Sequence, residues 1–234
     1  MKRFFGTQSD WRDFHQREAF DVVIFDGGES GEHSVLVSAR EDRLIKPVII
    51  PALTALVTEA DPDATVSTDF MPEALDSDFY LWLLYFHKYE SGLLSAAVKI
   101  TDINEIESSD RQRRSGKFGA GAGADRIELL ALIAKDQAKF GPAKFSVRYE
   151  EGIEADLDLH VFPDGGYSVF KTSEYKDHRS IPGNMLGHKL VEDVFELVLP
   201  SIRSLYNHDS DWRTGTREEF IRRSKSELDA VSRG

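Results

Sequence analysis

The stretch PDGGYSVFKTSEYK, residues 163–176, contains the residue types of a metal-dependent nuclease. Its Pro-Asp pair is followed ten residues later by Glu-x-Lys, the pattern written PD-(D/E)xK. In such a site two carboxylates hold Mg²⁺ and a lysine stabilises charge on the attacked phosphate. The chemistry therefore requires Asp164, Glu174 and Lys176 to lie within a few ångströms of one another.

The same stretch also reads as a β-hairpin. Asp164-Gly165 between alternating apolar residues is typical of a two-residue type I′ turn. Such a turn places Asp158 opposite Lys171 and leaves Glu174 about 30 Å from Asp164, at ~3.3 Å per residue. The two carboxylates then cannot share a metal, and we favour the hairpin.

A second metal candidate lies on the strand before this turn. Glu154, Asp156, Asp158 and His160 alternate, so all four point to one face of the strand. Carboxylates at this spacing can hold Mg²⁺ or Mn²⁺. The solvated face of an antiparallel sheet has the same pattern. The candidate metal ligands are Glu154, Asp156 and Asp158. In the predicted hairpin Glu174 and Lys176 lie close to Glu154, so a diverged nuclease site would use Asp156 in place of Asp164. The candidate catalytic residues are Asp156, Asp158, Glu174 and Lys176.

The segment RQRRSGKFGAGAGADR, residues 111–126, is basic and then rich in glycine and alanine. We expect residues 108–124 to form a loop that enters a helix N-terminus, where free amides favour anions. Neither a Walker A loop nor a dinucleotide-binding fingerprint fits the order of its glycines and lysine. The candidate anion-binding or partner-binding residues are Arg111, Arg113, Arg114, Lys117 and Arg126.

Composition limits the classes of function. The chain has 234 residues, a formal net charge of −12 and no cysteine, which excludes disulfides, thiolate metal sites and thiol nucleophiles. An acidic surface repels nucleic acid, so such binding would need a local basic patch. The most apolar run, residues 79–86, is shorter than the ~18 residues of a membrane span. We expect a cytoplasmic protein that binds no membrane.

The remaining pattern predicts mostly hairpins. Residues 20–39 read as two strands around a Gly-rich turn, and residues 79–107 as a second hairpin, with a short buried helix as the alternative for the run 79–90. Further strands are expected at 144–150, 154–162 and 166–172. Helices are expected at 51–60, from a cap at Asp125 to Gly141-Pro142, at 184–206 with a kink or break at Pro200, and from a Thr216–Glu219 capping box.

These elements predict an α+β fold, mainly an antiparallel sheet of β-hairpins with packed helices, two of them in the C-terminal third. We expect one domain over 1–234, with a subdomain boundary near 61–77 as the alternative.

For function, the sequence favours a non-catalytic binding or assembly component of an intracellular complex. It would contact a protein partner, or nucleic acid, through the 111–126 loop. The alternatives are a metal-dependent nuclease or phosphoryl-transfer enzyme, with Mg²⁺ as its cofactor, and a nucleotide-binding regulator.

Overall fold

The computed structural model describes residues 22–25, 33–37, 44–67, 74–109, 115–119, 126–136, 138–176, 181–183 and 185–231. The chain divides into two compact units, residues 1–68 and 69–234. No helix of the described residues is long and apolar enough to cross a bilayer.

The first unit contains a two-stranded sheet and one helical segment. Strands β1 (Val22–Phe25) and β2 (Ser34–Val37) pair antiparallel, as the alternation predicts. The helical segment consists of a π-turn, η3 (Ile45–Ile49), followed by α2 (Ile50–Ala60). Among the described side chains of this unit, Ile49 alone is buried. The described residues of this unit therefore bury little apolar surface.

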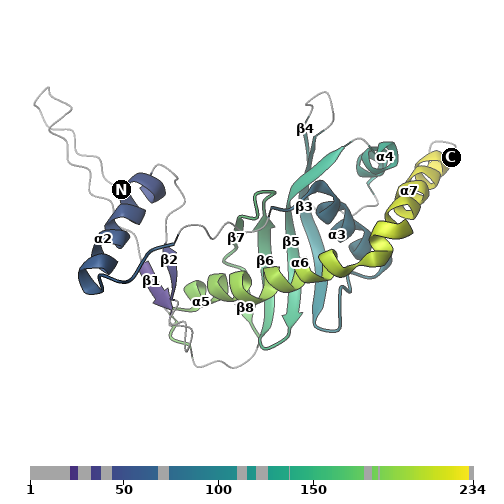
Figure 1. Cartoon of the computed structure of the whole chain (residues 1–234). Helices are drawn as coiled ribbons and strands as arrows, with labels where there is room; N and C mark the ends of the chain where they lie inside the picture. Colours follow the sequence, from purple (N-terminus) through teal and green to yellow (C-terminus); the bar gives the residue numbers. More distant parts are fainter. Residues whose placement is uncertain are drawn as a thin grey trace, which may run out of the picture. The chain divides into compact units, whose positions relative to one another are not determined.

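The second unit is built on an antiparallel sheet with the strand order β4-β3-β5-β6-β7, and β8 adds to β6 (Figure 1). Its elements, in chain order, are α3 (Ser77–Tyr89), β3 (Val98–Ser109), β4 (Ser115–Gly119), α4 (Ile127–Lys135), β5 (Lys139–Glu150), β6 (Glu154–Val161), β7 (Tyr167–Val169), β8 (Glu174–Tyr175), α5 (Leu186–Asp193), η4 (Val194–Val198), α6 (Leu199–His208), η5 (Trp212–Thr216) and α7 (Arg217–Val231). The predicted α+β class and its two long C-terminal helices are confirmed.

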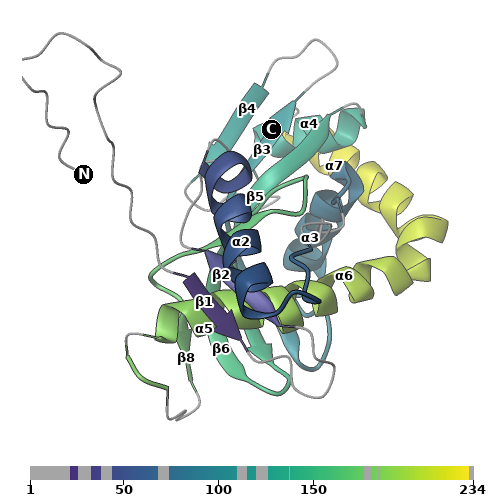
Figure 2. The same cartoon turned by 60° about the vertical axis from the view of Figure 1, so that its left-hand side comes forward.

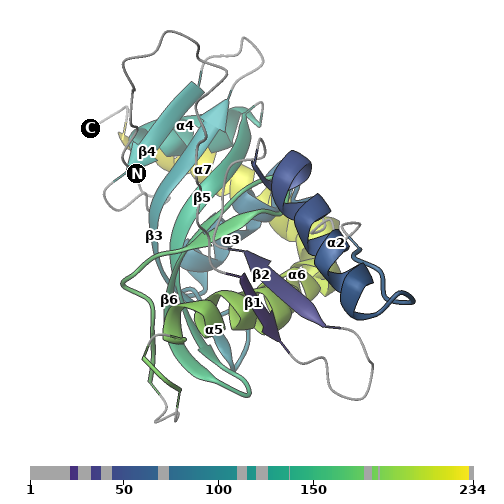
Figure 3. The ribbon, with the colours of Figure 1, turned by 90° about the vertical axis from the view of Figure 1, so that its left-hand side faces the viewer.

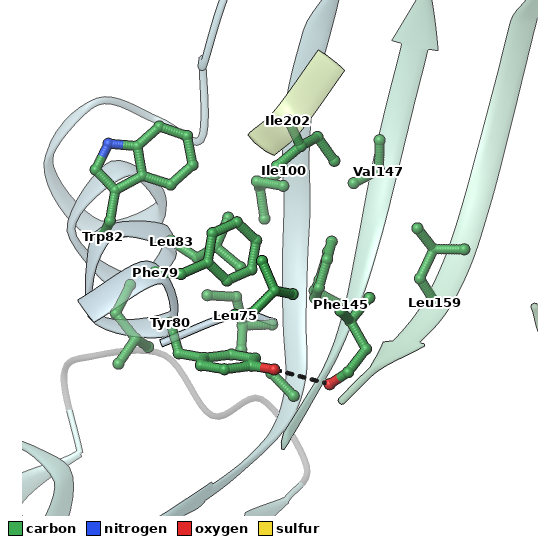
Figure 4. Close-up of a cluster of buried hydrophobic side chains, with 14 of the residues drawn as sticks. Leu75, Phe79, Tyr80, Trp82, Leu83, Ile100, Phe145, Val147, Leu159 and Ile202 are labelled. Atoms are coloured by element: carbon green, nitrogen blue, oxygen red, sulfur yellow. Dashed lines mark hydrogen bonds between the residues drawn. The ribbon is translucent and has the colours of Figure 1, made fainter. Parts of the chain in front are cut away.

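One face of this sheet forms the core. Along β6 the side chains alternate between buried and partly exposed, which is the period of a strand with one covered face. The helices α3 and α6 lie over the covered face: Phe79 and Tyr80 of α3 meet Phe145 of β5, and Ile202 of α6 joins the same cluster (Figure 4). The Tyr80 hydroxyl donates to the Val161 carbonyl of β6 at 3.4 Å.

The run 79–90 is helical, so the predicted second hairpin is wrong and its alternative is right. Six consecutive residues, Phe79–Leu84, are buried in α3, and such a dense run has no period that separates helix from strand. The deciding signal is Asp76, which precedes the run and accepts a hydrogen bond from the Phe79 amide at 2.8 Å. This is an N-cap interaction, which the sequence reasoning overlooked.

Two helix ends differ from their predictions. The helix α4 ends at Lys135, where Asp136 adopts the left-handed conformation (φ 46°), and Gly141-Pro142 lie inside β5. Thr216 is not an N-cap, because it belongs to η5. The Asp209 carboxylate caps that helical run instead, accepting from the Trp212 amide at 2.8 Å.

The prolines in the first turns of α2 and α6 each follow a π-helix, whereas Pro47 lies inside η3. The Ile50 amide bonds to the Ile45 carbonyl before Pro51, and the Leu199 amide bonds to the Val194 carbonyl before Pro200. Proline lacks an amide hydrogen and its ring clashes with the carbonyl four residues back, and a wider turn accommodates both effects. The helical run therefore continues from Leu186 to His208, without the break predicted at Pro200, and α6 extends across the sheet (Figure 2).

Arg217 joins three helices of the second unit. It contacts Asp78 in the first turn of α3 at 2.9 Å and Asp136 at the end of α4 at 2.8 Å, from the first position of α7. The helices α4 and α7 pack together (Figure 3). One guanidinium thus neutralises two carboxylates at the point where these helices meet.

We expect Arg217→Met to lower the free energy of unfolding by about 2 kcal/mol, because both acidic partners lose their counter-charge. Arg223→Met is the matched control, since Arg223 pairs with Glu219 on an exposed face of the same helix. Urea denaturation followed by circular dichroism measures both. Equal losses in the two variants would show that Arg217 does not join the helices energetically.

Candidate functional site

The uncovered face of the sheet in the second unit is polar and holds the candidate acidic residues. The strand register aligns its side chains in rows that run across the strands. One row contains Lys99, Arg148, Asp156 and Glu174. Another contains Glu105, Lys144, His160 and Ser168. Each row places an acidic group beside a basic one, Asp156 next to Arg148 and Glu105 next to Lys144, as is favourable for cross-strand neighbours.

Three of the four candidate catalytic residues come together. Asp156 of β6 pairs with Glu174 of β8, and the Lys176 ammonium contacts both carboxylates, reaching Asp156 Oδ2 at 3.3 Å. Arg148 Nε donates to the other oxygen of Asp156 at 3.0 Å. The hydrogen bond from Arg148, assisted by Lys176, outweighs burial and lowers the pKa of Asp156.

The other acidic candidates lie apart from this cluster. The Asp158 carboxylate accepts hydrogen bonds from the hydroxyls of Ser146 and Thr172. Glu154 is exposed at the start of β6, where its carbonyl accepts from the Lys176 amide at 2.7 Å. Within the described ranges, no three His, Asp or Glu side chains are placed to hold a metal ion. A cation bound to Asp156 and Glu174 would have to displace Lys176.

The Pro163-Asp164 pair belongs to the turn between β6 and β7 and lies far from the acidic cluster. Its turn is one residue longer than predicted: Leu159 pairs with Val169, and Gly165 takes a positive φ of 81°. This is a three-residue hairpin with a left-handed glycine, and it shifts the register by one, so that Asp158 does not lie opposite Lys171. Asp164 lies about 25 Å along β6 from the Asp156–Glu174 pair, at ~3.3 Å per residue.

The turn also contacts α6 and the segment that leads into α3. The Pro163 carbonyl accepts from the Leu75 amide at 2.8 Å, and the Gly165 carbonyl accepts from Arg203 of α6 at 3.2 Å. A hollow of about 140 Å³ lies beside it, lined by Ala74, Leu75, Asp76, Arg203, Tyr206 and Asn207. Its volume is well below the roughly 300 Å³ at which pockets for larger ligands begin.

The second row centres on Glu105 of β3, whose side chain is only 14% exposed. Its carboxylate lies 2.9 Å from the ammonium of Lys117 on β4 and 3.0 Å from that of Lys144 on β5. Burial by itself would raise the pKa of Glu105, but the two lysines outweigh it and lower the pKa. The neighbouring His160 has a lowered pKa because it is partly buried and lies close to Lys144.

The predicted basic loop contains a strand. Residues 115–119 form β4, so the prediction of a loop over 108–124 is wrong for these central residues. Ser109 pairs with Ser115, and the five residues between them, which include Arg111, Arg113 and Arg114, connect β3 to β4. These three arginines lie outside the described residues, as does the predicted cap Asp125.

The two described basic candidates both have partners within the chain. Lys117 contacts Glu105 and, at 3.7 Å, Glu107. Arg126 precedes α4, and its Nη1 donates to the Gly119 carbonyl at 3.0 Å. That contact joins the end of β4 to the start of the helix. Lys117 therefore ties the centre of β4 to β3, and Arg126 ties the last residue of β4 to the start of α4, roles that the sequence pattern did not indicate.

Comparison of the chain with protein-family models, with curated proteins and with solved structures finds no match.

The lowered pKa of Glu105 predicts the pH dependence of stability. Its ionised form is favoured in the folded chain, so its contribution is present above the ordinary carboxyl pKa of 4.5 and is lost as the pH falls below that value. We expect Glu105→Gln to be less stable than the parent at pH 7 and to approach it at pH 3. Urea denaturation across this range measures the difference.

Glu107→Gln is the control for that series, because Glu107 has a longer contact with Lys117 and a more exposed side chain. If the difference in the free energy of unfolding between Glu105→Gln and the parent did not change with pH, the lowered pKa of Glu105 would be contradicted.

Proposed function

We propose that this protein is a non-catalytic binding or assembly component that contacts an anionic or protein partner through the loop between β3 and β4. The observation that supports it is the connection of Ser109 to Ser115, which are paired, by five residues that include three arginines. This connection is basic in sequence, whereas the whole chain has a net charge of −12. Charge of this kind attracts an anionic surface locally although the whole molecule is acidic.

The charge balance of the polar face supports the same proposal. There the carboxylates of Glu105 and Asp156 are each contacted by two basic side chains. Ion pairs that are already satisfied gain little from an added ligand, because the ligand must first displace a partner. The basic segment of the loop is thus the stronger candidate for external contacts.

The test compares two triple variants of equal charge. Arg111→Ala/Arg113→Ala/Arg114→Ala removes the loop charges, and Arg222→Ala/Arg223→Ala/Lys225→Ala removes three charges from α7. Fluorescence anisotropy follows the binding of labelled twenty-residue poly-glutamate and of labelled single-stranded RNA. If three contacts form, the parent should lose about twenty-fold in RNA affinity between about 50 and 200 mM salt.

We expect the loop variant to lose binding and its salt dependence, and the α7 variant to keep both. Loss of binding in both variants would show that the overall charge of the protein, and not the loop, determines binding. Absence of binding of either probe by the parent would refute the contact with polyanions.

One observation favours a second candidate, a metal-dependent nuclease. Asp156, Glu174 and Lys176 have the residue types of the carboxylate–carboxylate–lysine site, and they are in contact on the polar face. Mg²⁺ held by the two carboxylates would polarise a phosphate, and Lys176 would stabilise its developing charge after moving off Asp156. No comparable observation among the described residues favours a nucleotide-binding regulator.

The nuclease alternative predicts Mg²⁺- or Mn²⁺-dependent cleavage of labelled DNA or RNA on a denaturing gel. Cleavage should disappear in Glu174→Gln and persist in Glu218→Gln, which removes an exposed charge from α7. If the parent cleaves neither DNA nor RNA with either metal, nuclease activity on these substrates is excluded.

A further inference from the structure

The hollow beside the turn at 163–165 is lined by two elements of the second unit. Residues 74–76, which lead into α3, form one part of the lining, and Arg203, Tyr206 and Asn207 of α6 form the other. Its volume is about 140 Å³. A cavity of about 150 Å³ is large enough to hold benzene. The hollow therefore has room for a ligand of roughly six non-hydrogen atoms.

Asp76 contributes a negative charge whose position is fixed. As the N-cap of α3, its Oδ1 accepts from the Phe79 amide at 2.8 Å, and the same oxygen accepts from the Tyr206 hydroxyl at 2.9 Å. No described residue donates to the other oxygen, Oδ2, and Asp76 is exposed. One carboxylate oxygen thus orients the group, and the second is accessible to a ligand.

Arg203 contributes a positive charge, and the neighbouring turn orients it. Its Nη2 donates to the Gly165 carbonyl at 3.2 Å, and the residue is half-buried. The Pro163 carbonyl of the same turn accepts from the Leu75 amide at 2.8 Å, next to Asp76. A guanidinium presents several N–H donors in one plane, which suits a carboxylate. Both charges are therefore in place before a ligand binds, which lowers the entropic cost of binding.

The rest of the lining is small and partly polar. Burial and the neighbouring Asp76 raise the pKa of the Tyr206 hydroxyl, so this group stays protonated and holds Asp76 at neutral pH. The Asn207 side chain is exposed and can both donate and accept hydrogen bonds. Ala74 and Leu75 provide the apolar part. Such a lining suits a short side chain and leaves no room for a large one.

The charges select the class of ligand. A small anion would be attracted by Arg203 and repelled by Asp76, and a small cation would experience the reverse. A ligand that carries both charges a few bonds apart is attracted by both residues. Because it is neutral overall, the net charge of −12 does not oppose its approach. An α-amino acid in its zwitterionic form has this arrangement at the required size.

We propose that the hollow between residues 74–76 and α6 binds a free α-amino acid with a short side chain, such as glycine, alanine or serine. The carboxylate of the ligand would lie against Arg203 and its ammonium group against Asp76. This binding site goes beyond the function proposed above and does not depend on the loop between β3 and β4.

The probe is L-alanine, titrated into the isotope-labelled full chain and followed by two-dimensional amide NMR spectra. We expect saturable shifts at Leu75, Asp76 and Asn207, with a Kd on the order of 1 mM, because so small a ligand makes few contacts. Acetate and ethylammonium each carry one of the two charges and should bind about tenfold more weakly at matched ionic strength. L-Phenylalanine should cause no shift, because its side chain exceeds the hollow.

Asp76→Asn tests the charge without removing the helix cap, because asparagine is an equally good N-cap residue. This variant should bind alanine about tenfold more weakly and acetate more tightly than the parent does. Asn207→Leu fills the hollow and should abolish alanine binding. Its matched control is Ser204→Leu, which should bind as the parent does, since Ser204 is exposed on the same helix and does not line the hollow.

Several results would overturn this site. Shifts that do not saturate, or that spread over the whole chain, would show that the hollow binds no amino acid specifically. Equal binding of alanine and acetate by the parent, or unchanged alanine binding by Asp76→Asn, would contradict the recognition of a zwitterion. Alanine binding retained in Asn207→Leu would place the ligand elsewhere. None of these results bears on the basic loop, whose test uses polyanions.

Discussion

The one-sided burial of the five-stranded sheet is the constraint on which the second unit depends. Each strand turns alternate side chains toward α3 and α6, so a shift of one residue would exchange the apolar and polar faces. The register must therefore be held across every strand pair. The three-residue turn at 163–165 holds it between β6 and β7, with a left-handed glycine. The order of the polar rows on the other face follows from that same register.

Those rows explain how a chain with net charge −12 forms a stable polar face. Carboxylates contact lysine and arginine side chains from neighbouring strands there, and the residues that resemble a nuclease site are part of this arrangement. Such pairing neutralises charge locally, while the unpaired excess of acids keeps the whole molecule negative.

The sequence predicted the parts of the fold that periodicity determines. The strands β5 and β6 alternate clearly, and the C-terminal helices have an apolar face, so both appeared in the expected places. Periodicity could not show whether α3 is a helix or a strand, because the run Phe79–Leu84 is apolar throughout. The signal that distinguishes the two is the helix cap at Asp76. It also could not locate β4, since a strand that contains two glycines within a Gly/Ala-rich segment resembles a loop.

For the candidate site, the alternation of Glu154, Asp156 and Asp158 correctly placed the three residues on one face. The predicted hairpin also placed Glu174 and Lys176 near the start of β6, where the structure pairs Glu174 with Asp156. The exact contact of Lys176 with Asp156 depends on the length of the connection between β7 and β8. The rule for the turn between β6 and β7 does not predict that length. The contacts of Lys117 with β3 and of Arg126 with Gly119 likewise depend on β4, a strand that the sequence did not reveal.

Asp209 lies between the two C-terminal helical runs and has a consequence for spectroscopy. One of its carboxylate oxygens caps the run that begins η5, and the other accepts from the indole Nε1 of Trp82 on α3 at 2.8 Å. Trp212 is buried beside it, next to Tyr85. Two of the three tryptophans of the chain therefore lie where the C-terminal helices contact α3. The intrinsic fluorescence of the protein should follow the docking of the C-terminal helices onto α3 more closely than the integrity of the sheet.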